Sequence, residues 1–215
     1  MNSRQIRQTY RWMAPVYDPL FRRFYRRMRA ESIGALELTP TDTVALVGVG
    51  TGLDLPLLPN VARIVGFDLT RSMLRRATRA RCIGPADLIL ADGARLPLRD
   101  ASVSVVILHL VLSVAPDPAA VLREASRVLQ PGGRTAVLDH FAPAGRPGLL
   151  RRVLSRVPRA LGTHLDRTFE DMIADTPFSV VTDRRFFRDV YRAVVLVSDG
   201  SARAERGEAR HVRNQ

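Results

Sequence analysis

The sequence contains a single cysteine, few aromatic residues and no long apolar run. Cys82 stands alone among 215 residues, so neither an internal disulfide nor a cysteine-rich metal site is expected, and a reducing cytoplasm is the natural compartment. The longest apolar run, Val103 to Val114, contains His109 and is shorter than the ~20 residues that a membrane-spanning helix needs. The first residues also lack the apolar core of a signal peptide. The sequence therefore predicts a cytoplasmic globular protein without a metal site.

Lysine is absent, and the charge is strongly unbalanced. All 33 basic residues are arginine, and the formal net charge is +12. Residues 1–30 hold eight arginines and one acid, Asp18, while residues 145–160 hold five arginines and no acid. These two segments account for the whole net charge, so an anionic surface is the expected partner.

Short apolar runs alternate with helical patterns through most of the chain. The runs are rich in Val, Ile and Leu on both faces, which is typical of a parallel sheet covered by helices on both sides. They span Thr43–Val49, Ala62–Asp68, Ala86–Ala91, Ser102–Leu108 and Gly133–Asp139, and the helical patterns span Arg71–Arg81 and Pro118–Leu129. Pro131-Gly132-Gly133 is interpreted as the stop of the second helix. Ser179–Arg185 and Val190–Ser198 predict a closing antiparallel pair.

The predicted fold class is α/β: a single domain built on a doubly wound, mostly parallel sheet of seven strands with an antiparallel C-terminal pair. Residues 1–34 are expected to form a basic, amphipathic helical cap, residues 35–198 the main ligand-binding domain, and residues 199–215 a flexible tail.

Glycines and acids follow the first three predicted strands. The first strand leads into Gly48-Val49-Gly50-Thr51-Gly52, which permits a tight turn and close approach of a ligand to the backbone. Asp68 ends the second strand 18 residues after Gly50, near the spacing of a ribose-binding acid. Asp92 ends the third strand and precedes Gly93. Each feature alone also fits a simple turn or a helix cap, but three strand ends in register indicate a nucleotide-like site.

These motifs and the segment Arg127–Gly133 resemble the ordered motifs of class I S-adenosylmethionine-dependent methyltransferases. The resemblance implies that S-adenosylmethionine is the cofactor, that Gly48–Gly52 lies under its methionine part, and that Asp68 holds the ribose hydroxyls. It implies that Asp92 meets the adenine amino group, with Gly93 and Ala94 beside the ring and Leu69 and Met73 flanking it. The family usually has Asp or Glu where this chain has Leu46, a departure that affects cofactor affinity rather than the fold.

Three further segments narrow the family. Tyr10–Asp18 resembles the N-terminal Tyr-x-x-Trp-Ala-Pro-x-Tyr-Asp pattern of bacterial phosphatidylethanolamine N-methyltransferases, relatives of the ubiquinone and menaquinone C-methyltransferases. Val111–Pro118 resembles the loop after their fourth strand, and Asp139-His140-Phe141 resembles the Asn-His-Phe that ends their fifth. The resemblance implies S-adenosylmethionine-dependent N-methylation of phosphatidylethanolamine, possible in successive steps towards phosphatidylcholine.

Three residues are candidates for the reaction itself. An amine nucleophile must lose its proton before it attacks, and His140 is the candidate to orient or deprotonate it. Tyr17 is expected to close over the methyl group, and His109 to line the cofactor. The plainer interpretations are a structural histidine for His140 and a core aromatic residue for Tyr17.

Two basic segments have apolar residues at helical spacing. Leu20, Phe21, Phe24, Tyr25 and Met28 alternate with arginines 22, 23, 26, 27 and 29, and Leu150, Val153, Leu154, Val157 and Leu161 with arginines 151, 152, 156 and 159. Such helices lie at a lipid boundary with their cations on anionic head groups. The expectation is a peripheral protein on the inner face of the membrane that contacts phospholipid head groups; the plainer interpretation is an apolar stripe that faces the core.

Other functions stay open from the sequence. A high isoelectric point is also typical of nucleic-acid binding, but aromatic residues are only 6% of the chain, so few bases could stack on it. C- or O-methylation of a quinone or other small molecule, RNA methylation, and a catalytically silent partner protein with the cofactor fold are the alternatives. The sequence does not indicate an oligomeric state.

Overall fold

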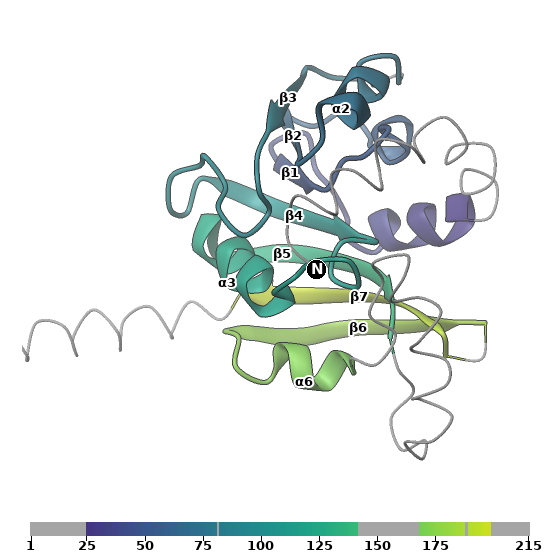
Figure 1. Ribbon diagram of the computed structural model, residues 1–215, viewed down its shortest axis with the longest axis vertical. Coiled ribbons are helices and arrows are strands. Elements are labelled where there is room, and N and C mark those ends of the chain that lie inside the picture. The colour runs from purple at the N-terminus through teal and green to yellow at the C-terminus, as the bar shows by residue number, and fades with distance from the viewer. Residues whose placement is uncertain (1–24, 81, 142–167, 188, 199–215) are drawn as a thin grey trace, which may run out of the picture.

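The described residues form one seven-stranded sheet with the order β3-β2-β1-β4-β5-β7-β6 (Figure 1). The computed structural model describes residues 25–80, 82–141, 168–187 and 189–198. The strands are β1 (Thr43–Val47), β2 (Arg63–Asp68), β3 (Ala86–Leu90), β4 (Val103–His109), β5 (Leu129–His140), β6 (Phe178–Phe186) and β7 (Tyr191–Ser198). The pairs among β1 to β5 are parallel, whereas β7 pairs antiparallel with β5 and β6. The predicted fold class is confirmed.

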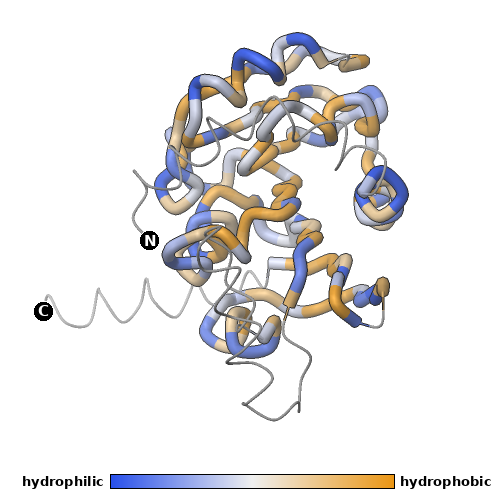
Figure 2. The backbone as a smooth tube through the Cα atoms, turned by 45° about the vertical axis from the view of Figure 1, so that its right-hand side comes forward, coloured by the Kyte–Doolittle hydropathy of each residue, from blue (hydrophilic) through white to orange (hydrophobic). Residues whose placement is uncertain are grey.

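Helices cover both faces of the sheet. One face packs against a helix over residues 25–34, the 3-10 helix η1 (Leu55–Leu57) and α2 (Arg71–Ala77). The other face packs against α3 (Pro118–Val128) and α6 (Phe169–Ile173). Figure 2 shows the hydrophobic stretches concentrated in the central strands, with hydrophilic stretches on the outer helices. The sheet is therefore the middle of three layers, as expected for strands that are apolar on both faces.

The edge strands differ from the expectation of strands buried on both faces. β1 and β4 are almost entirely buried, but four of the five residues of β3 are exposed. Ile89 and Leu90 are among the exposed apolar side chains, and so is Val180 of β6. An apolar composition indicates that a segment forms a strand. The position of the strand in the sheet decides how much of its surface is buried.

α3 and β5 follow each other without the predicted loop between them. α3 ends at Val128 and β5 begins at Leu129, so Pro131-Gly132-Gly133 lies inside the first part of the strand. The register with β4 shifts between Val103 and Val105, and Gly132 has φ of 74°. The proline and glycines therefore produce an irregular start to a strand, since proline cannot donate to the ladder and glycine accepts a positive φ.

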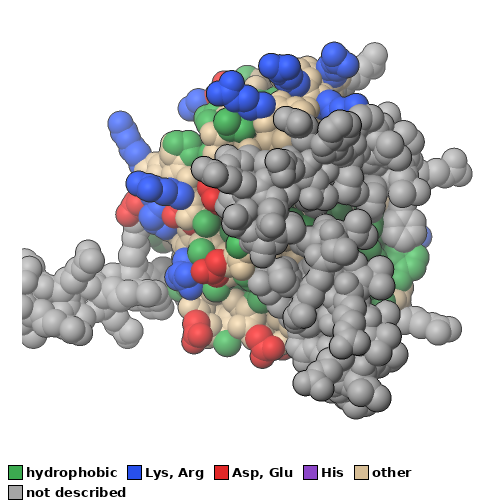
Figure 3. Space-filling model, in the orientation of Figure 1, with side chains coloured by type: hydrophobic (Ala, Val, Ile, Leu, Met, Phe, Trp, Pro, Cys, Tyr) green, Lys and Arg blue, Asp and Glu red, His purple; other side chains and the backbone are tan. Residues whose placement is uncertain are grey.

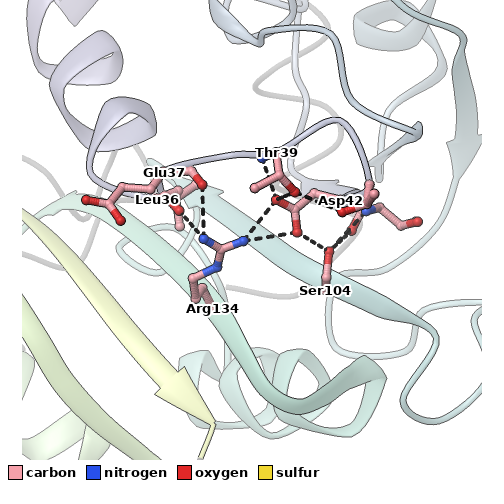
Figure 4. Close-up of polar contacts among 8 residues, drawn as sticks. Leu36, Glu37, Thr39, Asp42, Ser104 and Arg134 are labelled. Carbon is pink, nitrogen blue, oxygen red and sulfur yellow. Dashed lines mark hydrogen bonds and ion pairs between the residues drawn. The ribbon is translucent and has the colours of Figure 1, made fainter.

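A partly buried ion pair ties the chain that follows the helix over residues 25–34 to the N-terminal ends of the strands (Figure 4). Arg134 of β5 donates to both carboxylate oxygens of Asp42 at 3.0 and 2.9 Å and to the carbonyls of Leu36 and Glu37. Asp42 also accepts from Ser104 at 2.6 Å. Burial raises the pKa of Asp42, but hydrogen bonds from Ser104, Thr39 and Arg134 outweigh it and hold that pKa below its usual value. This cluster fixes the chain that follows the helix, and so the direction in which the helix enters the site.

Several predicted segments lie outside the described residues. They include the Tyr10–Asp18 pattern with Tyr17, the second basic segment 149–161 and the tail 199–215. In the described part of the chain, no helix is both long enough and apolar enough to span a bilayer.

Candidate functional site

A cavity of about 250 Å³ lies at the carboxyl ends of β1, β2, β3 and β4. This is the edge where the strand order reverses between β1 and β4, the position at which open α/β sheets bind ligands. Of the residues predicted to bind the cofactor, those that line the cavity are Gly48, Val49, Gly50, Thr51, Asp68, Leu69, Met73, Asp92, Gly93, Ala94 and His109. The tertiary structure therefore brings together side chains from four strand ends that are far apart in the sequence.

The glycine loop needs its glycines for two different reasons. Gly48, Gly50 and Gly52 all have positive φ, at 70°, 57° and 85°, where other residues are strained. A Cβ on Gly48 would also collide with Val111. Gly52 is the one predicted loop residue that does not line this cavity; a Cβ there would lie 2.9 Å from that of Ala80. Gly48 thus lets the loop approach the β4 side of the cavity, and Gly52 lets it pack against the turn after α2.

Asp68 connects the glycine loop to the second strand. Its carboxylate accepts from the backbone N–H of Gly50 at 2.9 Å and from that of Thr70 at 2.8 Å. Burial raises the pKa of Asp68 above its usual value, although these two hydrogen bonds oppose the shift. A desolvated carboxylate at a cavity wall gains from further donors such as hydroxyl groups. The residue fits the ribose-binding role that the sequence predicts.

Asp92 and Gly93 form the wall contributed by the third strand. The Asp92 carboxylate accepts from the backbone N–H of Ala94 at 3.0 Å, which sets the turn after β3. A Cβ on Gly93 would lie 2.7 Å from Val47 Cγ1, so this turn also requires close approach to β1. Met73, 2% exposed, supplies an apolar surface from α2. This acid, narrow turn and apolar surface suit a flat heteroaromatic ring.

A buried polar network that sequence reasoning missed forms another wall. Arg29 donates to Asp54 at 2.5 Å, and the other Asp54 oxygen lies 2.8 Å from Nδ1 of His109. The Nε2 atom of His109 lies 3.0 Å from the Ser32 hydroxyl. Burial raises the pKa of Asp54, but the charge of Arg29 and the contact with His109 outweigh it and hold that pKa well below its usual range. Arg29 and His109 both line the cavity, so this network presents cationic and imidazole groups to a ligand.

One signal in the sequence pointed to Asp54. It is the single acid in the apolar stretch Leu53–Leu58, and such an acid is buried only with a partner. Leu46, which stands where the family has an acid, is 1% exposed and packs with Leu55 in one apolar cluster. Asp54, next to Leu55, brings a carboxylate to the same side of the sheet.

The structure corrects the interpretation of the first basic segment where it is described. Tyr25 and Met28 are 5% and 2% exposed and pack against Leu138 and Ala193. Tyr25 also hydrogen-bonds to Tyr191 at 2.7 Å. The plainer interpretation therefore holds for Tyr25 and Met28, which face the core because β5 and β7 lie beneath them. Arg29 is likewise a buried site residue rather than a surface cation; Arg26 and Arg27 are exposed.

His140 lies at the carboxyl end of β5, beside a fully buried carboxylate. Asp139 accepts from the backbone N–H groups of Ser113 at 3.0 Å and His140 at 2.8 Å, and its Oδ1 lies 3.2 Å from His140 Nδ1. The imidazole meets the Tyr191 ring edge-on at 5.8 Å. Nε2 of His140 is buried and has no hydrogen-bond partner among the described residues. His140 does not line the cavity described above, and Tyr17 lies outside the described residues.

Comparisons with known proteins point to methyltransferases. Residues 46–137 match the family model described as a methyltransferase domain. Over 140 residues, 63% of this chain and 69% of the relative, the chain is 34% identical to a phosphatidylethanolamine N-methyltransferase of Cereibacter sphaeroides. It is 33% identical to an arsenite methyltransferase of Halobacterium salinarum (51% and 30% of the two chains) and 34% identical to a demethylmenaquinone methyltransferase of Mycolicibacterium vanbaalenii (58% and 52%). The chain thus spans only about a third to a half of these last two relatives.

The solved structures agree on the fold. A complex of the Haloferax volcanii Trm112 methyltransferase activator with a putative methyltransferase matches with a TM-score of 0.75 at 17% identity, covering 88% of this chain and 97% of that chain. At this identity the likeness concerns the fold alone.

Proposed function

We propose that this chain, which belongs to the class I S-adenosylmethionine-dependent methyltransferases, methylates the amine of phosphatidylethanolamine at a membrane surface. S-adenosylmethionine is its cofactor. The observation that carries the choice of acceptor is the 34% identity over 69% of a phosphatidylethanolamine N-methyltransferase. The exposed arginines of the chain support an acceptor with a phosphate group, because guanidinium pairs with phosphate in bidentate geometry.

The residues of the 250 Å³ cavity fit the cofactor, and this cavity is called the cofactor cavity below. Asp68 would accept from the ribose hydroxyls and Asp92 from the adenine amino group, while the Gly48 turn admits close backbone approach. Arg29, which Asp54 holds in place, offers a cation to the methionine carboxylate. The bound cofactor supplies a methyl group on a sulfonium, already activated for displacement. The protein contributes alignment and exclusion of water, which lower the barrier without further covalent chemistry.

Asp68→Ala should weaken binding of S-adenosylhomocysteine by at least about 1 kcal/mol, because the variant removes a charged hydrogen-bond partner from the cavity wall. Calorimetric titration measures this loss. Asp175→Ala, which removes an exposed acid far along the chain, is the matched control and should bind as the wild type does. Unchanged affinity in the Asp68 variant would overturn the placement of the ribose.

The acceptor amine needs a group that receives or orients its proton. By analogy with lysine its pKa is about 10.4, so the reactive free amine is a minor species at neutral pH. We assign this task to His140, which lies at the ligand-binding edge of the sheet with Asp139 beside its Nδ1 atom. Its Nε2 atom is buried and has no partner within the described part of the chain, and it is the ring nitrogen that we assign to the amine.

A quinone is the second candidate acceptor, because the chain is 34% identical to a demethylmenaquinone methyltransferase over 52% of that relative. Arsenite is disfavoured by the chain's own chemistry. Soft metal and metalloid centres are held by thiolates, and Cys82, the single cysteine, does not line the cavity.

The test is transfer of labelled methyl from S-adenosylmethionine to separate preparations of phosphatidylethanolamine, demethylmenaquinone, arsenite and RNA. Label in mono-, di- or trimethylated phosphatidylethanolamine is the expected result. Label in the quinone or RNA alone would replace the proposed acceptor. Intact cofactor binding without label in any acceptor would point to the catalytically silent alternative.

A further inference from the structure

A second cavity, of about 690 Å³, lies beside the cofactor cavity and has no part in the proposed reaction. It is formed by the helix over residues 25–34, η1 with the loop before it, and α2 with the turn after it. Arg29, Thr51 and Leu53 line both cavities, so the two share a wall. The volume is within the range of small-molecule sites.

Four arginines line this arginine cavity: Arg26, Arg29, Arg76 and Arg79. Arg29 is paired with Asp54 and also lines the first cavity. Within the described part of the chain, the side chains of Arg26, Arg76 and Arg79 form no hydrogen bond or ion pair, and no acid is among the residues that line the cavity. Three unpaired cations around one hollow repel each other, and an anion placed between them removes that repulsion.

The surface next to the arginine cavity is also basic. Arg71 and Arg75 of α2 are exposed, and residues 71–79 contain four arginines and no acid. Figure 3 shows basic side chains gathered over α2. The net charge of the sequence did not reveal this cluster. Acids elsewhere in the chain balance these arginines in the total charge, but they do not line the arginine cavity.

We propose that the arginine cavity binds the phosphate of an anionic phospholipid and thereby docks the protein on the membrane with its cofactor cavity close to the surface. Guanidinium groups form bidentate hydrogen bonds with phosphate oxygens. Leu53, Pro56 and Leu57 line the same cavity and offer apolar contact to the glycerol and upper acyl carbons of a lipid. The described lining residues include no aromatic side chain, so a nucleic acid would find phosphate ligands but no surface on which its bases stack.

This inference rests on the proposed function for its choice of a lipid. It extends the expected docking surface from residues 20–30, where Arg29 proves to be buried, to α2. The shared wall explains why docking would matter: a lipid held in the arginine cavity brings neighbouring head groups next to the cofactor cavity.

The test compares two triple variants of equal charge. The first changes Arg26, Arg76 and Arg79 to Gln, and the control changes Arg63, Arg99 and Arg123, which do not line the cavity, to Gln. Co-sedimentation uses phosphatidylcholine vesicles with and without phosphatidylglycerol at ~0.1 M salt, where exposed charges act over ~10 Å. The cavity variant should lose about 100-fold in affinity for the anionic vesicles, as expected for three cations at a membrane surface. The control should lose less than about threefold, because its arginines are spread over other surfaces.

Two measurements separate docking from folding and from the choice of acceptor. Both variants should retain the wild-type melting temperature and affinity for S-adenosylhomocysteine. Methylation of a short-chain phosphatidylethanolamine, dissolved as monomers, should be the same for the cavity variant as for the wild type. In a separate outcome, the wild type methylates no phosphatidylethanolamine while the cavity variant still loses vesicle binding. That result would support the docking site and would rule out the proposed acceptor.

Three outcomes would overturn the inference. Equal losses in both variants would mean that only net charge matters. Release of the wild type from anionic vesicles by millimolar inorganic phosphate would mean a site for small anions. The third outcome concerns RNA. If the wild type binds poly(U) RNA but not anionic vesicles, and the cavity variant no longer binds the RNA, the cavity would be assigned to nucleic acid.

Discussion

Asp54→Asn is expected to lower the free energy of unfolding by about 3–5 kcal/mol at neutral pH, because the variant removes the charge of Asp54, with which the buried Arg29 pairs. The side chains of Arg29 and Asp54 are 7% and 4% exposed, so water cannot take the place of the missing charge. Asparagine keeps the shape and one acceptor, which isolates the charge as the cause. Urea unfolding followed by circular dichroism measures the loss.

The difference in the free energy of unfolding between the wild type and Asp54→Asn should decrease at acidic pH. The pKa of Asp54 is held well below its usual range in the folded protein. Its ionised form therefore contributes stability that is fully present above the unfolded pKa of about 3.9 and that is lost as the pH falls below it. The gap between wild type and Asp54→Asn should be constant from about pH 5 upward and should narrow in more acidic solution.

A double-mutant cycle provides the control for this prediction. Arg29→Met removes the partner charge of Asp54, so the double variant should be more stable than Asp54→Asn alone. The double variant should nevertheless bind S-adenosylhomocysteine weakly, because it lacks the cation at the cavity wall. Additive losses of stability would show that the two side chains do not act as a pair.

His140→Gln is expected to slow methyl transfer by about 10²–10⁴-fold, the usual contribution of a positioned acid–base group. The affinity for S-adenosylhomocysteine should not change, because His140 does not line the cofactor cavity. The loss should therefore appear in kcat, measured with labelled cofactor at saturating acceptor. Glutamine retains polar atoms and approximate length but cannot take up a proton at neutral pH.

Tyr191→Phe is the matched variant for the same site. Tyr191 packs edge-on to the His140 ring, and its hydroxyl contacts Tyr25 rather than the imidazole. This variant should keep methyl transfer within a few-fold of the wild type. A rate within about threefold of the wild type in His140→Gln would instead support the plainer interpretation of a structural histidine.

Sequence patterns predicted the sheet well, because strand formation is largely a local property. Apolar runs bounded by turn residues predicted both ends of β1, β2 and β4 to within two residues of the observed ends. The predictions were weakest where neighbours decide the outcome: β3 is apolar yet exposed because it lies at an edge. The sequence predicts a helix stop at Pro131 and the two glycines after it, but strand pairing begins before them, at Leu129.

Much of the lining of the 250 Å³ cavity was predicted for a related reason. Parallel strands present their carboxyl ends at one edge, so Gly48, Asp68 and Asp92 could be brought together from topology alone. The buried network around Arg29 and Asp54 could not be predicted in this way, because in the sequence Arg29 is one of several cations in a basic helix. Only packing shows that helix 25–34 turns Tyr25 and Met28 into the core and places Arg29 against Asp54.

The sequence by itself determined the class of fold and the glycines and acids that meet at the carboxyl edge of the sheet, since apolar periodicity and the glycine–acid spacing are local signals. The tertiary structure decided which charges are buried and which converge. Arg29 became part of the site through the orientation of its helix, and Arg26 joined Arg76 and Arg79 across 50 residues of sequence to form the arginine cavity. Electrostatic effects depend on separation in space and on burial, neither of which a count of charges along the chain contains.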